Sequence, residues 1–225
     1  MSQPIVIAID GPAGAGKSTV ARKLAQRLGL DYVDSGATYR AAALYVLERG
    51  ISVDDERAVV EAIAQAAIQF TTDGTASRVL LDGQDVTTRI RTPEVTAVAA
   101  MVSRLPAVRE KLVALQRALA CGRGVVMEGR DIGTVVFPNS PLKIFLKADP
   151  TERARRRLHQ ERNEGRDTTL EETALEITRR DQSDAERQIS PLLAAPDAHE
   201  IDSTHLTAEQ VVDRIVQLAQ ERLHP

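Results

Sequence analysis

The sequence predicts an α/β protein built on a five-stranded parallel sheet with helices on both faces, in a three-layer sandwich. Three observations predict this fold. Short apolar runs typical of buried strands alternate with segments of helical periodicity along the chain. The first run, residues 5–9, is continuous and mostly β-branched, as in strands that are buried on both faces. A glycine cluster follows directly, at the strand end where open α/β sheets bind ligands.

The first half of the chain supplies two strands of this sheet and a hairpin. Residues 17–28 place apolar side chains at helical spacing, and Gly29 stands where a C-cap glycine belongs. Residues 31–36 form a short second strand, followed by an alanine-rich helix over 37–49. Residues 67–90 contain two glycine-centred turns between β-branched stretches, which predicts a hairpin rather than a crossover helix.

The second half returns to alternation. Residues 94–120 have helical periodicity, and Pro106 indicates a boundary between two helices. The remaining elements are strands over 125–127, 141–149 and 198–202, helices over 151–163 and 169–188, and a final helix from the Thr207–Gln210 capping box to about Leu223. Two segments, 37–110 and 151–190, do not fit the alternation. We interpret residues 1–225 as a single domain in which these two insertions cover the ligand-binding edge of the sheet.

Composition narrows the function classes. The 225 residues suit one domain with insertions, and a content of 43% hydrophobic and 27% charged residues is ordinary for a soluble globular protein. The net charge of −3 favours neither a nucleic acid nor an acidic membrane as partner. The single cysteine, Cys121, excludes an internal disulfide and favours a reducing, cytoplasmic location. We expect no signal peptide, no membrane span and no structural zinc site.

The segment GPAGAGKS, residues 11–18, matches the phosphate-binding loop (P-loop) pattern G-x-x-x-x-G-K-[S/T] at every fixed position. Gly11 and Gly16 can adopt backbone angles that turn N–H groups toward phosphate oxygens. Lys17 would reach the β- and γ-phosphates, and Ser18 would place its hydroxyl on Mg²⁺. The helix that follows directs its positive end at the same anion. The motif predicts a nucleoside triphosphate site, and the alternative is a structural glycine-rich turn.

The motif alone does not distinguish a switch, a motor and a kinase. A GTP switch needs an [N/T]-K-x-D segment that reads guanine, and LKAD at 146–149 lacks the Asn or Thr. VVMEG at 125–129 is a weak version of the acidic strand of a motor. Glu128 could hold a water molecule on Mg²⁺, or it could be a strand-end carboxylate with no metal role.

The distribution of arginines favours a kinase. The chain has 24 Arg against five Lys, which fits phosphate handling but could also reflect codon bias. Arg40 and Arg130 follow predicted strands, and nine arginines fall within 151–190. Arg153 and Arg157 share a helix face, whereas Arg155 is expected on a solvated face. We interpret 151–190 as an Arg-rich helical lid, because phosphoryl transfer needs positive charge around the transferring group.

The chain resembles the bacterial cytidylate (CMP/dCMP) kinase family, which are P-loop nucleoside monophosphate kinases. The segments that carry the resemblance, in order, are GPAGAGKST, DSGATYR, EGRDIGTVVFP, KIFLKADPTERARRR and RRDQSDAERQISPL. The resemblance implies ATP-dependent phosphorylation of CMP and dCMP to CDP and dCDP, with Mg²⁺ and arginine charge stabilisation and no general base. It also implies that 37–110 is the nucleoside monophosphate-binding insertion and, weakly, that the protein is a monomer.

The resemblance also implies site residues. ATP would bind across Gly11, Pro12, Ala13, Gly14, Ala15, Gly16, Lys17, Ser18 and Thr19. The CMP phosphate would be gripped by Arg40, Arg130 and Arg187, the base read by Asp131 and Arg109 with Ser35 nearby, and the ribose met by Arg180 and Asp184. Arg153 and Arg157 would close over ATP. The catalytic residues would be Lys17, Arg130, Arg187, Arg153 and Arg157, and the metal ligand Ser18.

One position departs from the family. Ala100 stands nine residues before Arg109, where members of the family carry a serine that helps to recognise the base. Ser103 lies three residues on, on a similar helix face, and is a candidate substitute. Three other hypotheses stay open: a kinase for another nucleotide or a hydroxy acid such as shikimate, a nucleotide-dependent switch, and a non-catalytic interaction module.

Overall fold

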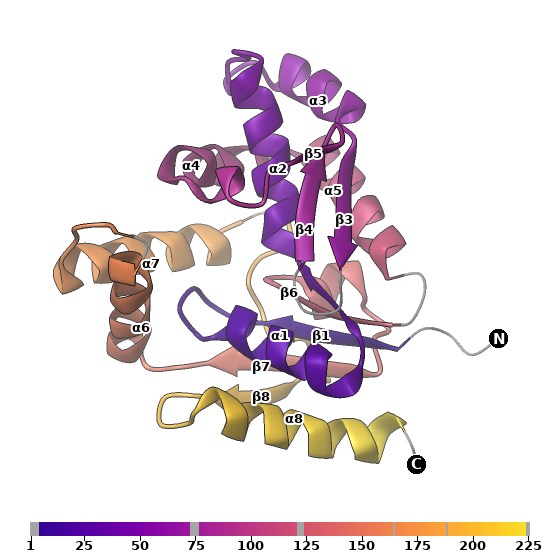
Figure 1. The fold of residues 1–225 in the computed structure, drawn as a ribbon, viewed down its shortest axis with the longest axis vertical. Coiled ribbons are helices and arrows are strands. Elements are labelled where there is room, and N and C mark those ends of the chain that lie inside the picture. Colours follow the sequence, from indigo (N-terminus) through magenta and orange to yellow (C-terminus); the bar gives the residue numbers. More distant parts are fainter. Residues whose placement is uncertain (1–4, 73–76, 121–123, 164, 188, 224–225) are drawn as a thin grey trace.

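The structure, a computed structural model, describes residues 5–72, 77–120, 124–163, 165–187 and 189–223 (Figure 1). Its centre is the predicted five-stranded sheet, in the strand order β2-β6-β1-β7-β8 with every pair parallel. The strands are β1 (Val6–Asp10), β2 (Asp31–Asp34), β6 (Val125–Gly129), β7 (Leu142–Lys147) and β8 (His199–Asp202). Asp10 pairs in register with Gly129 and Phe145, so the carboxyl ends of the three central strands meet at one edge.

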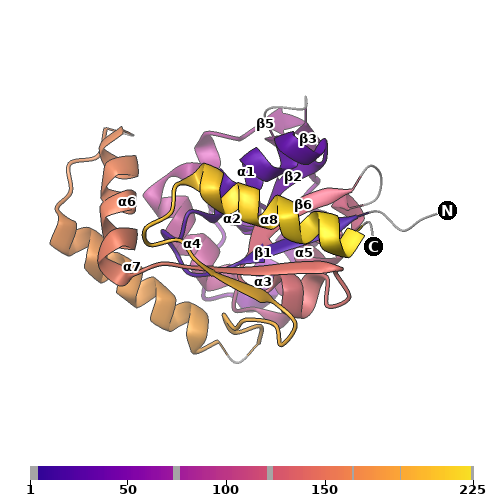
Figure 2. The same cartoon turned by 90° about the horizontal axis from the view of Figure 1, so that it is seen from below.

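Helices cover both faces of the sheet, and the alternation of side chains explains why. Ile7 and Ile9 pack on one face against α1 (Lys17–Leu28) and α8 (Ala208–Leu223), which lie side by side (Figure 2). Val6 and Ala8 face the other side, where α5 (Pro106–Leu119) and a π-helix, η2 (Ile132–Val136), cover the sheet. The three-layer sandwich is confirmed, and its central strand is buried on both faces.

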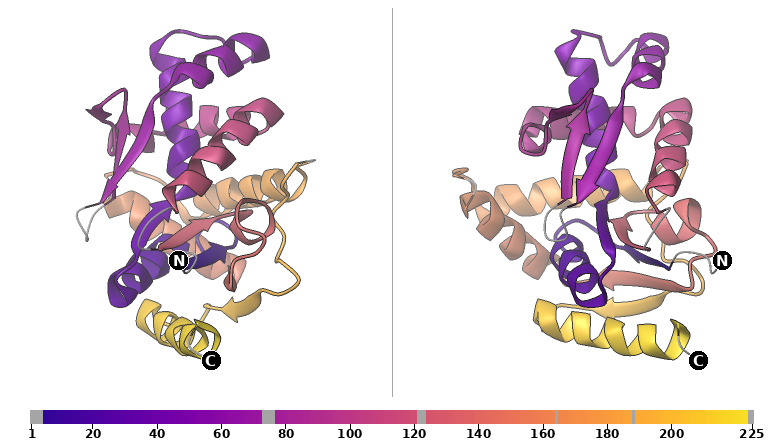
Figure 3. Two further views of the ribbon diagram at one scale, coloured as in Figure 1. Left: turned by 90° about the vertical axis from the view of Figure 1, so that its right-hand side faces the viewer. Right: turned by 45° about the vertical axis from the view of Figure 1, so that its right-hand side comes forward.

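A second tier stands on the carboxyl edge of the sheet and has its own apolar core. It consists of α2 (Ser35–Glu48), α3 (Glu56–Gln65), β3 (Ile68–Thr72), β4 (Ser77–Leu81), β5 (Gln84–Asp85), the short helix η1 (Arg89–Arg91), α4 (Pro93–Val102) and part of α5. The three strands form the predicted small antiparallel sheet, which lies beside α2 (Figure 3). One predicted turn, at 82–83, has positive φ at both residues, as a tight hairpin requires. The other falls at 73–76, outside the described residues.

A hairpin of two helices, α6 (Pro150–Asn163) and α7 (Leu170–Ala185), projects beside the same edge (Figure 1). The buried carboxylate of Glu161 holds this α6–α7 hairpin together. It pairs with Arg157 of α6 at 2.9 Å and with Arg166 of the connecting loop at 3.4 Å. It also accepts a hydrogen bond from the Thr173 hydroxyl of α7 at 3.4 Å. Across the described ranges, no helix is both long and apolar enough to span a membrane.

The structure differs from the sequence expectations mainly at element ends. Helix α2 begins at Ser35 rather than 37, because the Asp34 side chain accepts a hydrogen bond from the Ala37 amide and caps it. Pro106 stands at the first position of α5, where a missing N–H does no harm. Helix α3 and the π-helix were not expected, although the Asp55 cap of α3 is a readable signal. The capping box of α8 is confirmed, with reciprocal Thr207–Gln210 hydrogen bonds of 2.9 and 3.2 Å.

Candidate active site

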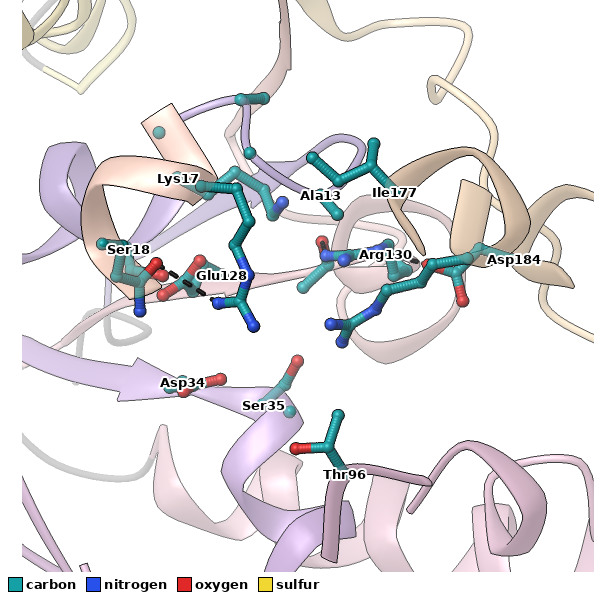
Figure 4. Close-up of a pocket in the computed structure, with 18 of the residues that line it drawn as sticks. Ala13, Lys17, Ser18, Asp34, Ser35, Thr96, Glu128, Arg130, Ile177 and Asp184 are labelled. Atoms are coloured by element: carbon teal, nitrogen blue, oxygen red, sulfur yellow. Dashed lines mark hydrogen bonds and ion pairs between the residues drawn. The ribbon is translucent and has the colours of Figure 1, made fainter. Parts of the chain in front are cut away.

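A cavity of about 1060 Å³ opens at the carboxyl edge of the sheet, between the P-loop, the second tier and the α6–α7 hairpin. Its volume lies slightly above the range of about 300–1,000 Å³ that is usual for small-molecule sites. Residues 13–19 of the P-loop form one wall. Figure 4 shows Ser35 and Thr96 on the wall opposite the P-loop, with Arg130 and Asp184 between them and Ala13.

The P-loop has the backbone that its glycines predict. Gly11 has φ 149°, and a Cβ there would lie 2.0 Å from the Leu146 carbonyl oxygen of β7, so only glycine fits. Gly16 precedes α1 with φ 90° and makes no side-chain cap, which leaves the first amides of α1 available to an anion. The Lys17 side chain is buried and donates to the Pro12 carbonyl at 2.7 Å.

Lys17 lies in a positive environment. Burial and the Arg130 guanidinium together lower the pKa of Lys17 to about 7, while Glu128 opposes the shift. A phosphate group between Lys17 and Arg130 would raise the pKa of Lys17 again. Glu128, at the end of β6, is buried and accepts a hydrogen bond from the Tyr32 hydroxyl at 2.6 Å. Burial raises the pKa of Glu128, and hydrogen bonds from Ser18 and Tyr32 act against the rise.

Asp10, for which no role is predicted from the sequence, shapes the turn after β6. Its two carboxylate oxygens accept from the amides of Ile132 (2.8 Å) and Gly133 (2.7 Å) in the π-helix. Burial raises the pKa of Asp10 to about 6. These contacts tie the end of the central strand to the segment that carries Arg130 and Asp131. The sequence indicates this role only through the position of Asp10, at the end of a strand and directly before the P-loop.

The buried carboxylate of Asp184 brings two of the predicted phosphate-binding arginines together. Arg130 Nε donates to Asp184 Oδ2 at 2.7 Å, and Arg187 pairs with Oδ1. Burial alone would raise the pKa of Asp184, but Arg130 and Arg187 hold it below its ordinary value. Arg180 lies in the same wall and, among the described residues, makes no hydrogen bond or ion pair. Burial and the charge of Arg130 lower the pKa of Arg180 to about 10.

Two arginines that line the cavity, Arg40 and Arg187, each have a buried donor without a hydrogen-bond partner among the described residues. Arg40 donates to Asp34 Oδ2 at 2.5 Å, yet its Nε is buried without a hydrogen-bond partner among the described residues. The Nε of Arg187 is also buried without a hydrogen-bond partner in the described part of the chain. Arg91, which sequence reasoning did not single out, also lines the cavity, and its charge acts on Asp34. Buried donors without acceptors are costly, so this region fits an anionic ligand with several oxygens.

The predicted base-reading pair lies deeper in the cavity. Arg109 and Asp131 form an ion pair in which both side chains are buried. Arg109 also donates to the Ser103 carbonyl at 3.3 Å, and its guanidinium lies 5.5 Å from the centre of the Tyr39 ring. Ala100 and Ser103 both line the cavity, but the Ser103 hydroxyl donates to the Ala100 carbonyl at 2.9 Å.

The arginines of α6 that line the cavity are not the pair expected from the sequence. Arg157 lines the cavity and pairs with Glu161 at 2.9 Å. Arg153 is buried and is not part of the cavity wall, because it donates to the Ala13 carbonyl at 3.1 Å and pairs with Asp181. Arg156 takes its place in the wall and donates to the Ser203 carbonyl at 2.7 Å. Arg155 is solvated as expected, with 67% of its side chain exposed.

The fold and this site define a class. A P-loop at the carboxyl edge of a five-stranded parallel sheet, facing a cavity lined with arginines, is the arrangement of a P-loop kinase. Solved structures support the fold. An uncharacterised protein from Eubacterium ventriosum aligns with a TM-score of 0.53 at 12% identity, over 97% of this chain and 99% of that one. TT1252 from Thermus thermophilus aligns with a TM-score of 0.51 at 19% identity, over the full length of both chains.

The family follows from sequence comparison. The cytidylate kinase family model matches residues 7–221. The cytidylate kinase of Geobacillus kaustophilus is 49% identical over 223 residues, covering 99% of this chain and 100% of the relative. That of Pelotomaculum thermopropionicum is 50% identical over 211 residues, covering 93% of each chain. This chain belongs to the cytidylate kinase family and is a phosphotransferase, as the sequence motifs predict.

Proposed function

We propose that this protein transfers the γ-phosphoryl group of ATP to CMP and dCMP, giving CDP and dCDP. The observation that carries the proposal is that three arginines, Arg40, Arg130 and Arg187, line the same cavity as the P-loop and the Arg109–Asp131 pair. A two-substrate kinase needs a triphosphate loop and a second anion site in one cavity, and this cavity has both kinds of lining. The relatives named cytidylate kinase support the choice of acceptor.

The P-loop would hold ATP. Residues Gly11 to Thr19 present backbone amides, Lys17 presents its ammonium group to the β- and γ-phosphates, and the uncapped start of α1 adds its positive end. Arg156 and Arg157 of α6 line the same part of the cavity and would cover the nucleotide. Arg153 would act from behind the loop, since it holds the Ala13 carbonyl.

Mg²⁺ fits the residues at this end of the cavity. Ser18 offers a hydroxyl and Glu128 a buried carboxylate, and both line this part of the cavity. Both are oxygen donors, which Mg²⁺ prefers. Within the described ranges no group of three or more His, Cys, Asp and Glu could hold a metal, so phosphate oxygens and water would complete the coordination. When bound, the ion would neutralise charge between the β- and γ-phosphates.

The acceptor would bind across the opposite half of the cavity. Arg40, Arg130 and Arg187 would surround its phosphate, with Asp184 holding two of them in place. The Asp131 carboxylate would accept a hydrogen bond from the exocyclic amine of cytosine, while its ion pair with Arg109 holds it in place. Ser35 lies on the same wall. Arg180 and Asp184 would contact the ribose.

The transfer would need no general base. Lys17, Arg130 and Arg187, with Arg157 from the α6–α7 hairpin, would stabilise charge on the transferring group. Residues 151–190, the segment that carries the α6–α7 hairpin, would act as a lid that excludes water. Residues 37–110 would bind the acceptor. We further propose that the protein acts as a cytoplasmic monomer on nucleotide substrates, without a nucleic-acid or membrane partner.

A panel of acceptors tests this function. ADP release with ATP and Mg²⁺ is measured for CMP, dCMP, UMP, AMP, GMP and shikimate. We expect turnover with CMP and dCMP to exceed that with every other acceptor. Preferred turnover of another acceptor would overturn the substrate assignment, and acceptor-independent hydrolysis would support a nucleotide-dependent switch instead.

A further inference from the structure

Side chains of the α6–α7 hairpin hold both polar groups of the Ala13 residue in the P-loop. The Ala13 amide donates to Asp181 Oδ1 of α7 at 3.3 Å. The Ala13 carbonyl accepts from Arg153 Nη1 of α6 at 3.1 Å. Arg153 and Asp181 pair with each other, and Arg153 Nε also donates to the Ala148 carbonyl at 3.2 Å. The loop, α6 and α7 are therefore joined in one closed set of hydrogen bonds.

The packing around this contact is close. A Cβ on Gly14 would lie 2.8 Å from the Arg153 carbonyl oxygen and 2.9 Å from the Arg153 Cβ, so the loop rests directly on the first turn of α6. Only glycine allows this approach. Arg153 is buried, and 22% of the Asp181 side chain is exposed. The contact is thus a built part of the fold and not a surface ion pair.

The last turn of α7 also reaches two other parts of the cavity. The Ser183 hydroxyl accepts from Arg104, in the second tier, at 2.8 Å. The Asp184 carboxylate accepts from Arg130, at the end of β6, at 2.7 Å. One turn of α7 therefore contacts the P-loop, the second tier and an arginine proposed to bind the acceptor phosphate. These contacts are made by Asp181, Ser183 and Asp184 respectively.

A nucleotide contact does not explain Asp181. Its negative charge lies at a loop that binds anions, and Arg153 neutralises it. A carboxylate in this place can instead hold two parts of the fold in position. It couples the conformation of the P-loop to the position of α7, on which Arg180 and Asp184 lie.

We propose that Asp181 is a positioning residue that fixes the P-loop and α7 in one register, so that donor binding on the loop strengthens acceptor binding on α7. The proposal rests on the proposed function for the identity of the acceptor. By linkage, the same residue would make acceptor binding strengthen donor binding by an equal factor.

The first test measures this coupling factor. CMP affinity is determined by calorimetry with and without a non-hydrolysable ATP analogue and Mg²⁺, in the wild type, Asp181→Asn and Asp181→Glu. We expect a wild-type factor of about 5 or more. It should fall to within about twofold of one in Asp181→Asn and recover partly in Asp181→Glu, which keeps the charge.

Glu186→Gln is the matched control, because Glu186 is exposed, ends the same helix and has no side-chain hydrogen bond or ion pair in the described parts of the chain. It should keep the wild-type factor. A wild-type factor in Asp181→Asn, or an equal loss in Glu186→Gln, would overturn the proposal.

The second test needs no acceptor. Hydrogen exchange of the nucleotide-free protein is compared between wild type and Asp181→Asn. We expect exchange about tenfold faster in peptides from the P-loop and α7, and unchanged exchange in α8. Unchanged exchange in the P-loop and α7 would overturn the proposal. If the wild type does not phosphorylate CMP, the proposed function fails while this exchange experiment still decides the role of Asp181.

Discussion

The lowered pKa of Lys17 predicts that ATP binding takes up a proton. Burial and Arg130 bring the pKa of Lys17 from 10.5 to about 7 in the nucleotide-free protein. Bound phosphates favour the charged ammonium and raise this pKa again. Because the bound form then holds a proton that the free form has partly lost, uptake grows as pH rises above the pKa of the free protein.

The magnitude follows from these values. With a free pKa of about 7 and a bound ammonium group that stays fully protonated, about 0.9 proton is taken up at pH 8, about 0.5 at pH 7 and about 0.1 at pH 6. At pH 8 Asp10 does not contribute, because its pKa is about 6. The dependence on pH therefore identifies the lysine.

Calorimetry measures the uptake. A non-hydrolysable ATP analogue with Mg²⁺ is titrated at pH 8 into protein in two buffers that differ in ionisation enthalpy. Lys17→Met should abolish the buffer dependence, and Lys23→Met, at an exposed lysine of the same helix, should leave it unchanged. Equal heats in both buffers for the wild type, or the same uptake in Lys17→Met, would refute the reasoning.

Three further predictions test the acceptor site and the loop. Arg187→Ala should raise the CMP KM by about 100-fold, or about 2.7 kcal/mol, with ATP affinity retained, because a charged hydrogen bond to phosphate is lost; steady-state kinetics showing an unchanged KM would contradict this. Asp131→Ala should relax the preference for CMP over UMP and AMP and, because it leaves Arg109 buried without its partner, reduce stability by about 3–5 kcal/mol. Kinetics and urea unfolding measure both, and retained discrimination speaks against base reading. Gly11→Ala should prevent stable folding, since its Cβ would lie 2.0 Å from a backbone oxygen of β7, whereas Gly29→Ala, with open space around it, should lose about 1 kcal/mol in the same urea unfolding experiment. Similar losses in both glycine variants would show that steric contact does not explain the first.

Local patterns made much of the fold predictable. The strands could be found because each is a short apolar run, and the P-loop because its residues are consecutive. Helix α3 could have been found too, since Asp55 caps it and Val59 and Ile63 share a face. The π-helix could not, because the amides of its first two residues donate to Asp10, which lies more than a hundred residues away in the chain.

The site was less predictable than the fold. Arg153 and Arg157 share a helix face, but the rotation of α6 against the P-loop decides that Arg153 is buried and Arg156 reaches the cavity. No sequence pattern contains that rotation. In the same way, the pairing of Arg130 with Asp184 joins residues 54 positions apart, so the sequence could indicate the two charges but not their contact.

The separate apolar core of the second tier has a thermodynamic consequence. In the second tier, α2, α3 and the strands β3 and β4 pack around apolar side chains such as Val59 and Ile90. These side chains are separate from the two apolar clusters on the faces of the five-stranded sheet. The wall that it turns toward the cavity is formed largely by small and polar residues such as Ser35 and Thr96. Movement of the tier toward the sheet would therefore bury little hydrocarbon. We expect the heat-capacity change of substrate binding to be small, and its sign to be set by the nucleotide bases rather than by the protein.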